Sequence, residues 1–393
     1  MAERKPKLSE KELQQWKLIG DFRERLAKEC SRKEQSGPWQ DRRRRLEQWD
    51  YLSLFLFALI NPAIKSLRAI SAGSGLERVQ KEVCSRGVSL GSLSEAQHLA
   101  EPELLEKLIA SLSAEVQGPA PAHPHTDWQK WLARDSSIFP ATARMFWAQH
   151  GAGKAGCHNH AVRFHVSLHL WDDKPGKVAV TPGKICERKV WREQLEAGAT
   201  YVGDRYFAED YKMFSQLEEK GCHFVLRLRD EAVWQVEEEL AVSATEAQQQ
   251  RVVKDAWGRL GCTARYRTAR LRVVTVRKAG GTLMRLVTNY APEEVSAGQI
   301  LTLYHRRWQI ECFFRWLKCL LACGHWLAQS QRGVTIQLYL AVIAGLLLQV
   351  VLGKRPNRRL WECLQLYLTG WATREELLQR VNAGLIKSDA KKS

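Results

Sequence analysis

Alternation between hydrophobic and polar residues predicts β-strands in the middle of the chain. The segment AVRFHVSLHL (161–170) has apolar residues at every second position, which is the period of a strand. The turn sequence WDDKPG follows, and KVAVTPG then predicts the returning strand of a hairpin. Further strands are predicted for TYVG before Asp204, HFVLRLR (223–229), LRVVTVR (271–277) and LMRLVTN (283–289). With the helix that ERKVWREQLEAG predicts up to Gly198, these elements indicate an α/β fold with mixed strand pairing.

Helical patterns fill the first 117 residues. The first 45 or so are charged and helix-prone, and YLSLFLFALI (51–60) predicts an apolar helix that Asn61 and Pro62 end. More helical segments follow up to about Val116. GPAPAHPH then has three prolines in eight residues, a composition typical of linkers. We therefore predict a helical region over 1–117 and a linker over 118–126.

One apolar segment, VTIQLYLAVIAGLLLQVVL (334–352), is long enough to span a membrane. Gln337 and Gln349 interrupt it, and Arg332 and Lys354 flank it. It stands alone in an otherwise polar chain, so we expect a buried helix and no membrane partner.

The stretch YHRRWQIECFFRWLK (304–318) places one carboxylate among cations and aromatic rings. On a helix, Tyr304, Arg307, Glu311 and Lys318 fall within an arc of roughly 60°, opposite an apolar side. The pattern fits an amphipathic surface helix with ion pairs. It fits equally a metal-binding carboxylate beside groups that hold phosphate.

Charge favours the phosphate interpretation. The chain of 393 residues has 60 Lys and Arg against 43 Asp and Glu, a formal net charge of +17, which is typical of nucleic-acid binding. Its 10 cysteines show no CxxC pair, so we expect reduced thiols in the cytoplasm and no zinc module. GAGKAG (151–156) lacks the residues of a phosphate loop. The histidines of CHNH, with His165 and His169, indicate packed side chains rather than a zinc site.

Two further carboxylates lie where ligands gather. Asp204 ends a predicted apolar strand and is followed by Arg205, and Asp135 precedes Ser136 and Ser137. A charge is costly inside a sheet but is tolerated at the carboxyl end of a strand. Three carboxylates from separate elements could share two Mg²⁺ ions about 4 Å apart.

The spacing of Tyr304, Arg307, Glu311 and Lys318 resembles the Y-R-E-K signature of insertion-sequence transposases of the DDE class. The sequence is similar to the cut-and-paste branch that makes a hairpin at the transposon end. The preceding LVTNYAPEEVSAGQILTLYHRRWQIE also resembles this family, and the likeness extends over about 127–352. GDRY around Asp204 resembles the second-aspartate motif, and Asp135 with its two serines resembles the first.

Other aspartates compete for the first position. Asp127 lies nearer the linker and lacks the small residues that follow Asp135. Asp172 and Asp173 fall in the predicted hairpin turn.

The resemblance implies an RNase H-like catalytic domain over 127–355, with a β-rich insertion at about 230–290 and a helical tail over 356–393. The first aspartate would lie on the first strand, and the second would end the fourth. Asp135, Asp204 and Glu311 would hold two Mg²⁺ ions, with Mn²⁺ as a substitute, and catalyse strand cleavage and transfer. Tyr304, Arg307, Lys318 and Arg205 would contact DNA phosphates.

The resemblance also implies partners. These are double-stranded DNA (the inverted-repeat ends, recognised by residues 1–117, and the target) and a second copy of the chain, as a homodimer on paired ends. The location would be the bacterial cytoplasm, with the nucleoid. A catalytically silent DNA-binding relative of a transposase remains the alternative.

One position departs from the family. Members that flip a base during hairpin formation place a tryptophan four residues before the threonine that matches Thr288, and here that residue is Met284. A thioether offers no broad aromatic surface for a base. Trp257 and Trp308 are therefore the candidates for a substitute ring.

Overall fold

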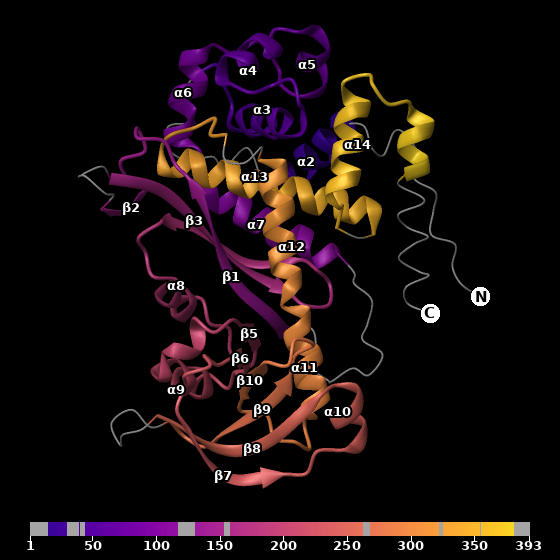
Figure 1. The fold of residues 1–393 in the computed structure, drawn as a ribbon. Coiled ribbons are helices and arrows are strands. Elements are labelled where there is room, and N and C mark those ends of the chain that lie inside the picture. The colour runs from indigo at the N-terminus through magenta and orange to yellow at the C-terminus, as the bar shows by residue number, and fades with distance from the viewer. Residues whose placement is uncertain are drawn as a thin grey trace. The chain divides into compact units, whose positions relative to one another are not determined.

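The computed structural model describes residues 15–29, 39, 44–116, 130–152, 158–261, 268–321, 325–353 and 355–380. The chain forms two compact units, each built from separated segments (Figure 1). The first contains Met1–Gly118, Phe139–Val162 and Phe314–Ser393, and the second contains Pro119–Ile138 and Arg163–Phe313. The linker predicted over 118–126 lies outside the described residues, and the domain limits drawn from the sequence stay predictions.

A mixed β-sheet organises the described part of the chain. Its strands follow the order β2-β3-β1-β5-β6-β10-β9-β8-β7, and β4 pairs with β3. The strands β1, β5 and β6 run parallel to one another. The pairs β6–β10, β10–β9, β9–β8 and β8–β7 are antiparallel. The α/β class with mixed pairing is therefore confirmed. The strands are β1 (Trp131–Pro140), β2 (Gln149–Ala152), β3 (His158–His169), β4 (Pro175–Pro182), β5 (Thr200–Gly203), β6 (His223–Arg227), β7 (Trp234–Leu240), β8 (Val252–Leu260), β9 (Leu271–Arg277) and β10 (Leu283–Thr288).

The core of the second unit packs on the parallel strands. β5 is buried along its whole length, and aromatic rings fill the space between it and the helices α8 (Glu187–Glu193) and α9 (Tyr211–Glu219). Trp191 of α8 contacts Tyr201 and Phe207 edge-on, with ring centroids 5.5 and 4.4 Å away. Burial of such rings is the main stabilising term of the unit.

Helix α8 is shorter than the sequence predicts. It ends at Glu193, and the chain then turns to β5 through Gly198, whose φ is +70°. The Glu196 N–H donates to Tyr201 Oη at 2.7 Å instead of continuing a helical ladder. Tertiary contacts thus override the helical pattern of the last residues.

The predicted insertion corresponds to β7 to β10 and to helix α10 (Ala244–Gln249), which lies between β7 and β8. These strands extend the same sheet instead of forming a separate one. The outer strand β7 is largely exposed, and its Glu237 and Glu239 pair with Arg259 and Lys254 of β8. Charged side chains of this kind discourage edge-to-edge pairing with other chains.

Helices build the first unit. They are α2 (Gln15–Glu29), α3 (Gln48–Ile60), α4 (Leu67–Ser74), α5 (Glu77–Glu82), α6 (Leu90–Leu99), α7 (Pro102–Glu115), the later part of α12, α13 (Gln331–Leu352) and α14 (Arg358–Leu368). The end of α3 at Asn61 agrees with the sequence prediction.

Helix α13 is the long apolar segment. Among the described helices it is the one long and apolar enough to cross a membrane, and 83% of its most apolar window is buried inside the structure. It packs against α7 and α3, and α3 is itself buried on every side. We expected α13 in the core of the catalytic domain, but it lies instead among the N-terminal helices, because two helices that are apolar all round can bury each other.

We expect replacement of glycine by alanine to have opposite effects on stability at two helical positions of this unit. In α13, a Cβ on Gly345 would lie 2.5 Å from Cη2 of Trp316, a ring that is 4% exposed. In α2, a Cβ on Gly20 would meet no heavy atom within 4 Å. Gly345→Ala should lower the free energy of unfolding by about 1–3 kcal/mol through overpacking.

Gly20→Ala is the matched control and should raise the free energy of unfolding by about 0.5–1 kcal/mol, because alanine loses less backbone entropy in a helix. Urea unfolding of both variants measures the two effects. A gain in stability for Gly345→Ala would mean that Trp316 is free to move away from α13.

Candidate active site

The register of two parallel strands brings two of the predicted carboxylates together. In the β1–β5 pair, Leu132 lies opposite Tyr201 and Ala133 opposite Val202. Asp135 and Asp204 each stand two residues beyond the last of these pairs, so they are level with one another and point to the same face. Neighbouring strands lie about 4.8 Å apart. The sheet therefore fixes the two aspartates side by side.

Close packing holds the end of β5. A Cβ on Gly203 would lie 2.8 Å from Leu226 Cδ2 and 3.0 Å from Phe207 Cδ2, so only glycine fits directly before Asp204. Asp204 Oδ1 then accepts a hydrogen bond from the Tyr206 N–H at 2.9 Å. The side chain is thereby oriented by its own turn.

Asp135 lies in an environment that disfavours its charge. Burial raises its pKa to about 7, with further contributions from the negative charges of Glu187 and Asp204, while the Ser136 N–H and Arg307 oppose the rise. The Ser136 N–H donates to Asp135 Oδ1 at 2.8 Å. Within the described residues, neither Asp135 nor Asp204 has an ion-pair partner. Carboxylates held together without a cation are a common feature of functional sites.

Glu187 is a fourth carboxylate of this site, and the sequence interpretation missed it. It is the first residue of α8, where an acid normally complements the helix dipole, so its position gave no signal of another role. Burial raises its pKa, and Asp204 adds to the rise. Its Oε1 is buried and accepts no hydrogen bond from the described residues, while Arg163 of β3 lies 3.7 Å from Oε2 and donates to Ser136 Oγ at 3.1 Å.

The third predicted carboxylate, Glu311, lies on a helix that is broken once. The predicted helix over 304–318 is in fact the end of α11 (Ala297–Arg306) and most of α12 (Trp308–Leu320). Arg307 joins them with φ −50° and ψ −32°, and its N–H donates to the Tyr304 carbonyl at 3.1 Å. This is one tightened turn of helical backbone. Side chains three and four residues apart still share a face across it.

Arg307 acts on two of the carboxylates. Its Nη2 donates to Glu311 Oε1 at 2.6 Å, and both Glu311 and Asp135 favour its charged form. The ion pair expected of a plain surface helix is therefore present. The same guanidinium also links α12 electrostatically to Asp135.

A turn of the sheet fixes the neighbouring residue Arg306. Its guanidinium lies 3.4 Å from the ring centroid of Trp171, and its Nη1 donates to the Leu170 carbonyl at 3.4 Å. Asp172 and Asp173 belong to the same turn, as predicted, and Asp173 favours the charge of Arg306. Asp127 lies outside the described residues, so Asp135 is the candidate first aspartate that the structure brings beside Asp204.

The other predicted phosphate contacts differ in exposure. Arg205 is exposed and Tyr304 is 9% exposed, with Arg307 5.6 Å from its ring centroid. Lys318 falls in the other compact unit, where its Nζ lies 5.5 Å from the ring centroid of Phe139. Tyr304, Arg307 and Glu311 therefore lie together in the second unit. Lys318 lies two turns further along α12.

The base-flip candidates also differ. Met284 of β10 is 6% exposed, whereas Trp308, the first residue of α12, is 53% exposed. Trp257 of β8 is half-buried, with Arg270 5.4 Å from its ring centroid. Trp316 packs against Gly345 of α13.

No group of three or more metal-binding side chains is assembled in the described residues. The described histidines form no such group either. His165, for example, is buried and hydrogen-bonded to Thr181 at 2.9 Å. The carboxylates nevertheless suit a hard cation, which prefers oxygen ligands. Burial and like charge disfavour ionisation of Asp135 and Glu187, and Glu187 Oε1 lacks a partner. A divalent cation would relieve both conditions.

Comparison with known proteins assigns the chain. The family model described as the transposase DDE domain matches residues 121–347, more than half of the sequence. The chain belongs to the DDE transposase family. Its relatives are insertion-sequence transposases by name, so the recognition of this class from the sequence is confirmed. Assignment of Tyr304, Arg307, Glu311 and Lys318 as the family signature stays a prediction.

Three relatives illustrate the likeness. A Sinorhizobium fredii protein named as a transposase is 29% identical over 226 residues, 57% of this chain and 61% of that protein. A Geobacillus stearothermophilus protein named for an insertion-sequence element is 29% identical over 206 residues, 52% of each chain. A Synechocystis protein named in the same way is 22% identical over 323 residues, 78% of this chain and 82% of that protein. The chain thus spans about half to three fifths of the length of the first two relatives.

A more distant likeness connects the DDE transposase to a solved structure. The piggyBac transposase synaptic complex with hairpin DNA aligns with 97% of this chain and 81% of that chain, at 11% identity and a TM-score of 0.40. We base no argument on it.

The environment of Asp135 predicts a gain in stability when its charge is removed. A carboxyl whose pKa is raised from 3.8 to about 7 by folding costs stability when ionised, and the cost vanishes as the pH falls below the unfolded value. Asp135→Asn should therefore raise the free energy of unfolding at about pH 8 by about 1–3 kcal/mol in EDTA. The difference should fade between about pH 7 and pH 4.

Urea unfolding at several pH values checks this, with the exposed Asp230→Asn as the control that should change little at any pH. An Asp135→Asn protein that is less stable than the parent at high pH would contradict the described burial of the carboxylate.

Proposed function

We propose that the chain is a DNA transposase that binds transposon ends, cleaves them with the help of divalent metal ions and joins them to a target by a cut-and-paste route. The β1–β5 register carries this proposal, because it aligns Asp135 with Asp204 at one face of the sheet. Glu311 would complete the set, from a helix that reaches Asp135 through Arg307.

An RNase H-like catalytic domain is part of the proposal. The order β4-β3-β1-β5-β6, with β1, β5 and β6 parallel, supports it. If the short β2 is not counted, Asp135 lies on the first strand and Asp204 follows the fourth. This is the arrangement that the family resemblance implies.

The carboxylates of Asp135, Asp204 and Glu311 would hold the metal, with Mg²⁺ as the expected ion, Mn²⁺ as its substitute and two ions per site. Two such ions, when bound, activate the attacking oxygen and stabilise the leaving oxygen of an in-line displacement at phosphorus. Glu187 lies beside the aspartates and would orient or supplement this set. Burial around Asp135 and Glu187 strengthens the charge interactions of these two carboxylates.

Arg307 would have two states. Without metal its guanidinium neutralises Glu311 at 2.6 Å. If Glu311 held a cation, the guanidinium would be free to contact a backbone phosphate, which its planar fork suits. Tyr304, Lys318 and the exposed Arg205 would add contacts to neighbouring phosphates.

The DNA partners follow from charge and family. A formal net charge of +17 supplies the attraction to phosphate that dominates DNA affinity. Residues 1–117 would recognise the inverted repeats, a homodimer would form on paired ends, and the protein would act in the bacterial cytoplasm at the nucleoid.

The first functional prediction concerns the three carboxylates. Asp135→Ala, Asp204→Ala and Glu311→Ala should each abolish cleavage of an end duplex in Mg²⁺ while leaving its binding nearly intact, because DNA affinity comes mainly from lysine and arginine. Nicking assays and gel shifts measure the two properties separately.

Asp230→Ala, an exposed carboxylate of the same unit, is the matched control and should cleave like the parent. Full cleavage by Asp135→Ala would move the first aspartate to Asp127. A parent that binds ends specifically but never cuts them would favour the catalytically silent DNA-binding alternative.

A second functional prediction concerns the ring that receives a flipped base. Trp308 is 53% exposed and stands one turn before Glu311, and base–aromatic stacking is worth about 1–3 kcal/mol. Trp308→Ala should therefore slow hairpin formation by about tenfold or more. Trp257→Ala should slow it less, because that ring is half-buried beside Arg270.

Fluorescence of 2-aminopurine at the terminal nucleotide reports base extrusion in both variants. A greater loss for Trp257→Ala would assign the stacking role to β8, and no loss in either variant would leave the role to Met284.

A further inference from the structure

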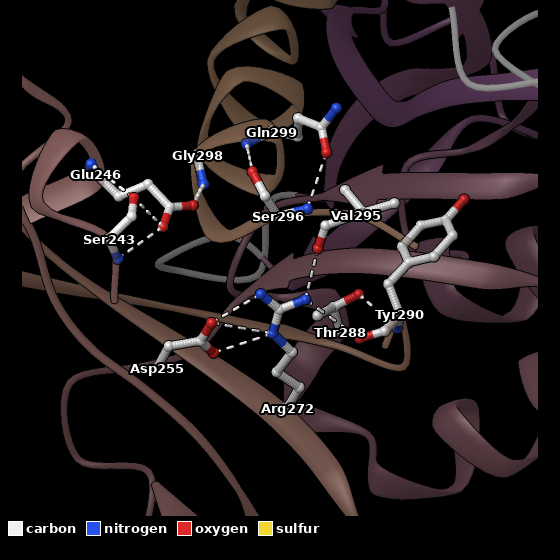
Figure 2. A network of polar contacts seen from close by, with 10 residues as sticks. All are labelled: Ser243, Glu246, Asp255, Arg272, Thr288, Tyr290, Val295, Ser296, Gly298 and Gln299. Atoms are coloured by element: carbon white, nitrogen blue, oxygen red, sulfur yellow. Dashed lines mark hydrogen bonds and ion pairs between the residues drawn. The ribbon is translucent and has the colours of Figure 1, made fainter. Parts of the chain in front are cut away.

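A buried ion pair in the insertion reaches the chain that leads into α11 (Figure 2). Arg272 of β9 is 1% exposed and binds Asp255 of β8, with Nη2–Oδ2 at 2.7 Å and Nε–Oδ1 at 3.0 Å. Its remaining Nη1 donates to the Val295 carbonyl at 2.6 Å and to the Tyr290 carbonyl at 3.5 Å. One guanidinium thus ties two insertion strands to the segment just before the helix.

A second contact from the insertion reaches the first turn of α11. Glu246 of α10 uses Oε2 to cap its own helix through Ser243, at 2.8 Å from Ser243 Oγ. Its Oε1 accepts the Gly298 N–H of α11 at 3.0 Å (Figure 2). Burial would raise the pKa of Glu246, but the hydrogen bonds from Gly298 and Ser243 outweigh it and hold the pKa below its usual value. One carboxylate therefore satisfies the ends of two helices.

The same two helices approach each other closely. A Cβ on Gly298 would lie 1.8 Å from Gln250 Oε1 and 2.6 Å from Gln250 Cδ, so a side chain at this position would displace the Gln250 side chain, which follows α10 directly. The first turn of α11 is also capped within its own helix by Ser296 and Gln299. The contacts of Glu246 and Gln250 are thus additional to ordinary helix capping.

We propose that the β-rich insertion positions the helices that carry Tyr304, Arg307 and Glu311. The positioning group, here named the α11 clamp, is Glu246, Asp255 and Arg272. It holds the approach to α11 through Arg272 and its first turn through Glu246. The inference rests on the proposed role of Glu311 at the metal site.

The helix geometry carries the effect of the clamp to Glu311. Thirteen residues separate Gly298 from Glu311, about 20 Å at 1.5 Å per residue. The two helices meet at Arg307, which keeps helical dihedrals and whose N–H donates to the Tyr304 carbonyl at 3.1 Å. A loosened first turn therefore shifts the carboxylate, and a misplacement of about 1 Å can cost up to ~100-fold in rate.

The test uses the full chain and variants at Glu246, since replacing the buried Arg272 would leave Asp255 unpaired and endanger folding. Glu246→Ala removes the acceptor for Gly298, and Glu246→Gln keeps an oxygen at that position. Ser243→Ala is the matched control, because it weakens the α10 cap but leaves the Glu246–Gly298 contact.

Two measurements are made on each variant. Hydrogen–deuterium exchange of peptides covering 308–314 reports the order around Glu311 without any catalysis. Cleavage of an end duplex in Mg²⁺ separates kcat from KM. Glu246→Ala should speed exchange at 308–314 and lower kcat about tenfold with KM unchanged, whereas Glu246→Gln and Ser243→Ala should resemble the parent.

A steric pair provides an independent arm. Gly298→Ala should reproduce the faster exchange and the lower kcat, and adding Gln250→Ala should restore both, because it removes the atoms that the new Cβ would meet. Rescue in the double variant supports positioning through this contact, and a double variant as impaired as Gly298→Ala counts against it.

The inference is overturned if faster exchange in Glu246→Ala stays within α10 and the first turn of α11, or if Ser243→Ala loses kcat equally. If the parent itself never cleaves DNA, the proposed function fails, and the exchange of 308–314 alone then decides whether the insertion positions the helix.

Discussion

The parallel pairing of β1 with β5 is the constraint on which the candidate site depends. Its register makes Asp135 and Asp204 neighbours, although they are 69 positions apart in the sequence. A shift of one residue would turn one of the two to the opposite face of the sheet. Buried apolar side chains on β5 and the tight packing of Gly203 against Leu226 and Phe207 oppose such a shift.

The third carboxylate depends on a different kind of contact. Glu311 lies on a helix, and a helix can slide or rotate on a sheet unless polar contacts fix it. Arg306 binds the hairpin turn through Trp171 and Leu170, and Arg272 binds the segment before α11. The first contact lies beside Glu311 and the second at the far end of the helix. Hydrogen bonds at both ends define the position better than apolar packing between them does.

Much of this arrangement could be predicted from local patterns. Strict alternation of polar and apolar residues predicts β3, and apolar runs predict β5 and β6. The charge of Asp204 directly after an apolar run indicates the end of a strand. What failed depends on tertiary partners. Glu187 looks like an ordinary helix-start acid, α13 finds its place only through α3 and α7, and nothing in the spacing of Tyr304 and Glu311 indicates the tightened turn at Arg307. The Arg272–Asp255 pair joins residues on two strands, which no single-strand pattern reveals.

Acidic residues gather at the candidate site although the chain as a whole is basic. The charge interactions within the site account for this combination. Asp135 and Glu187 ionise with difficulty where they lie, because burial and like charges disfavour the ionised forms, whereas Glu311 is neutralised locally by Arg307. In the proposed function, a divalent cation held by these carboxylates would offset their negative charge, and it would leave the Arg307 guanidinium free to contact a phosphate. Metal binding and phosphate binding would then reinforce each other. Such coupling requires that Glu311 stay at a fixed distance from the two aspartates. In our proposal, the contacts between α10 and α11 fix that distance.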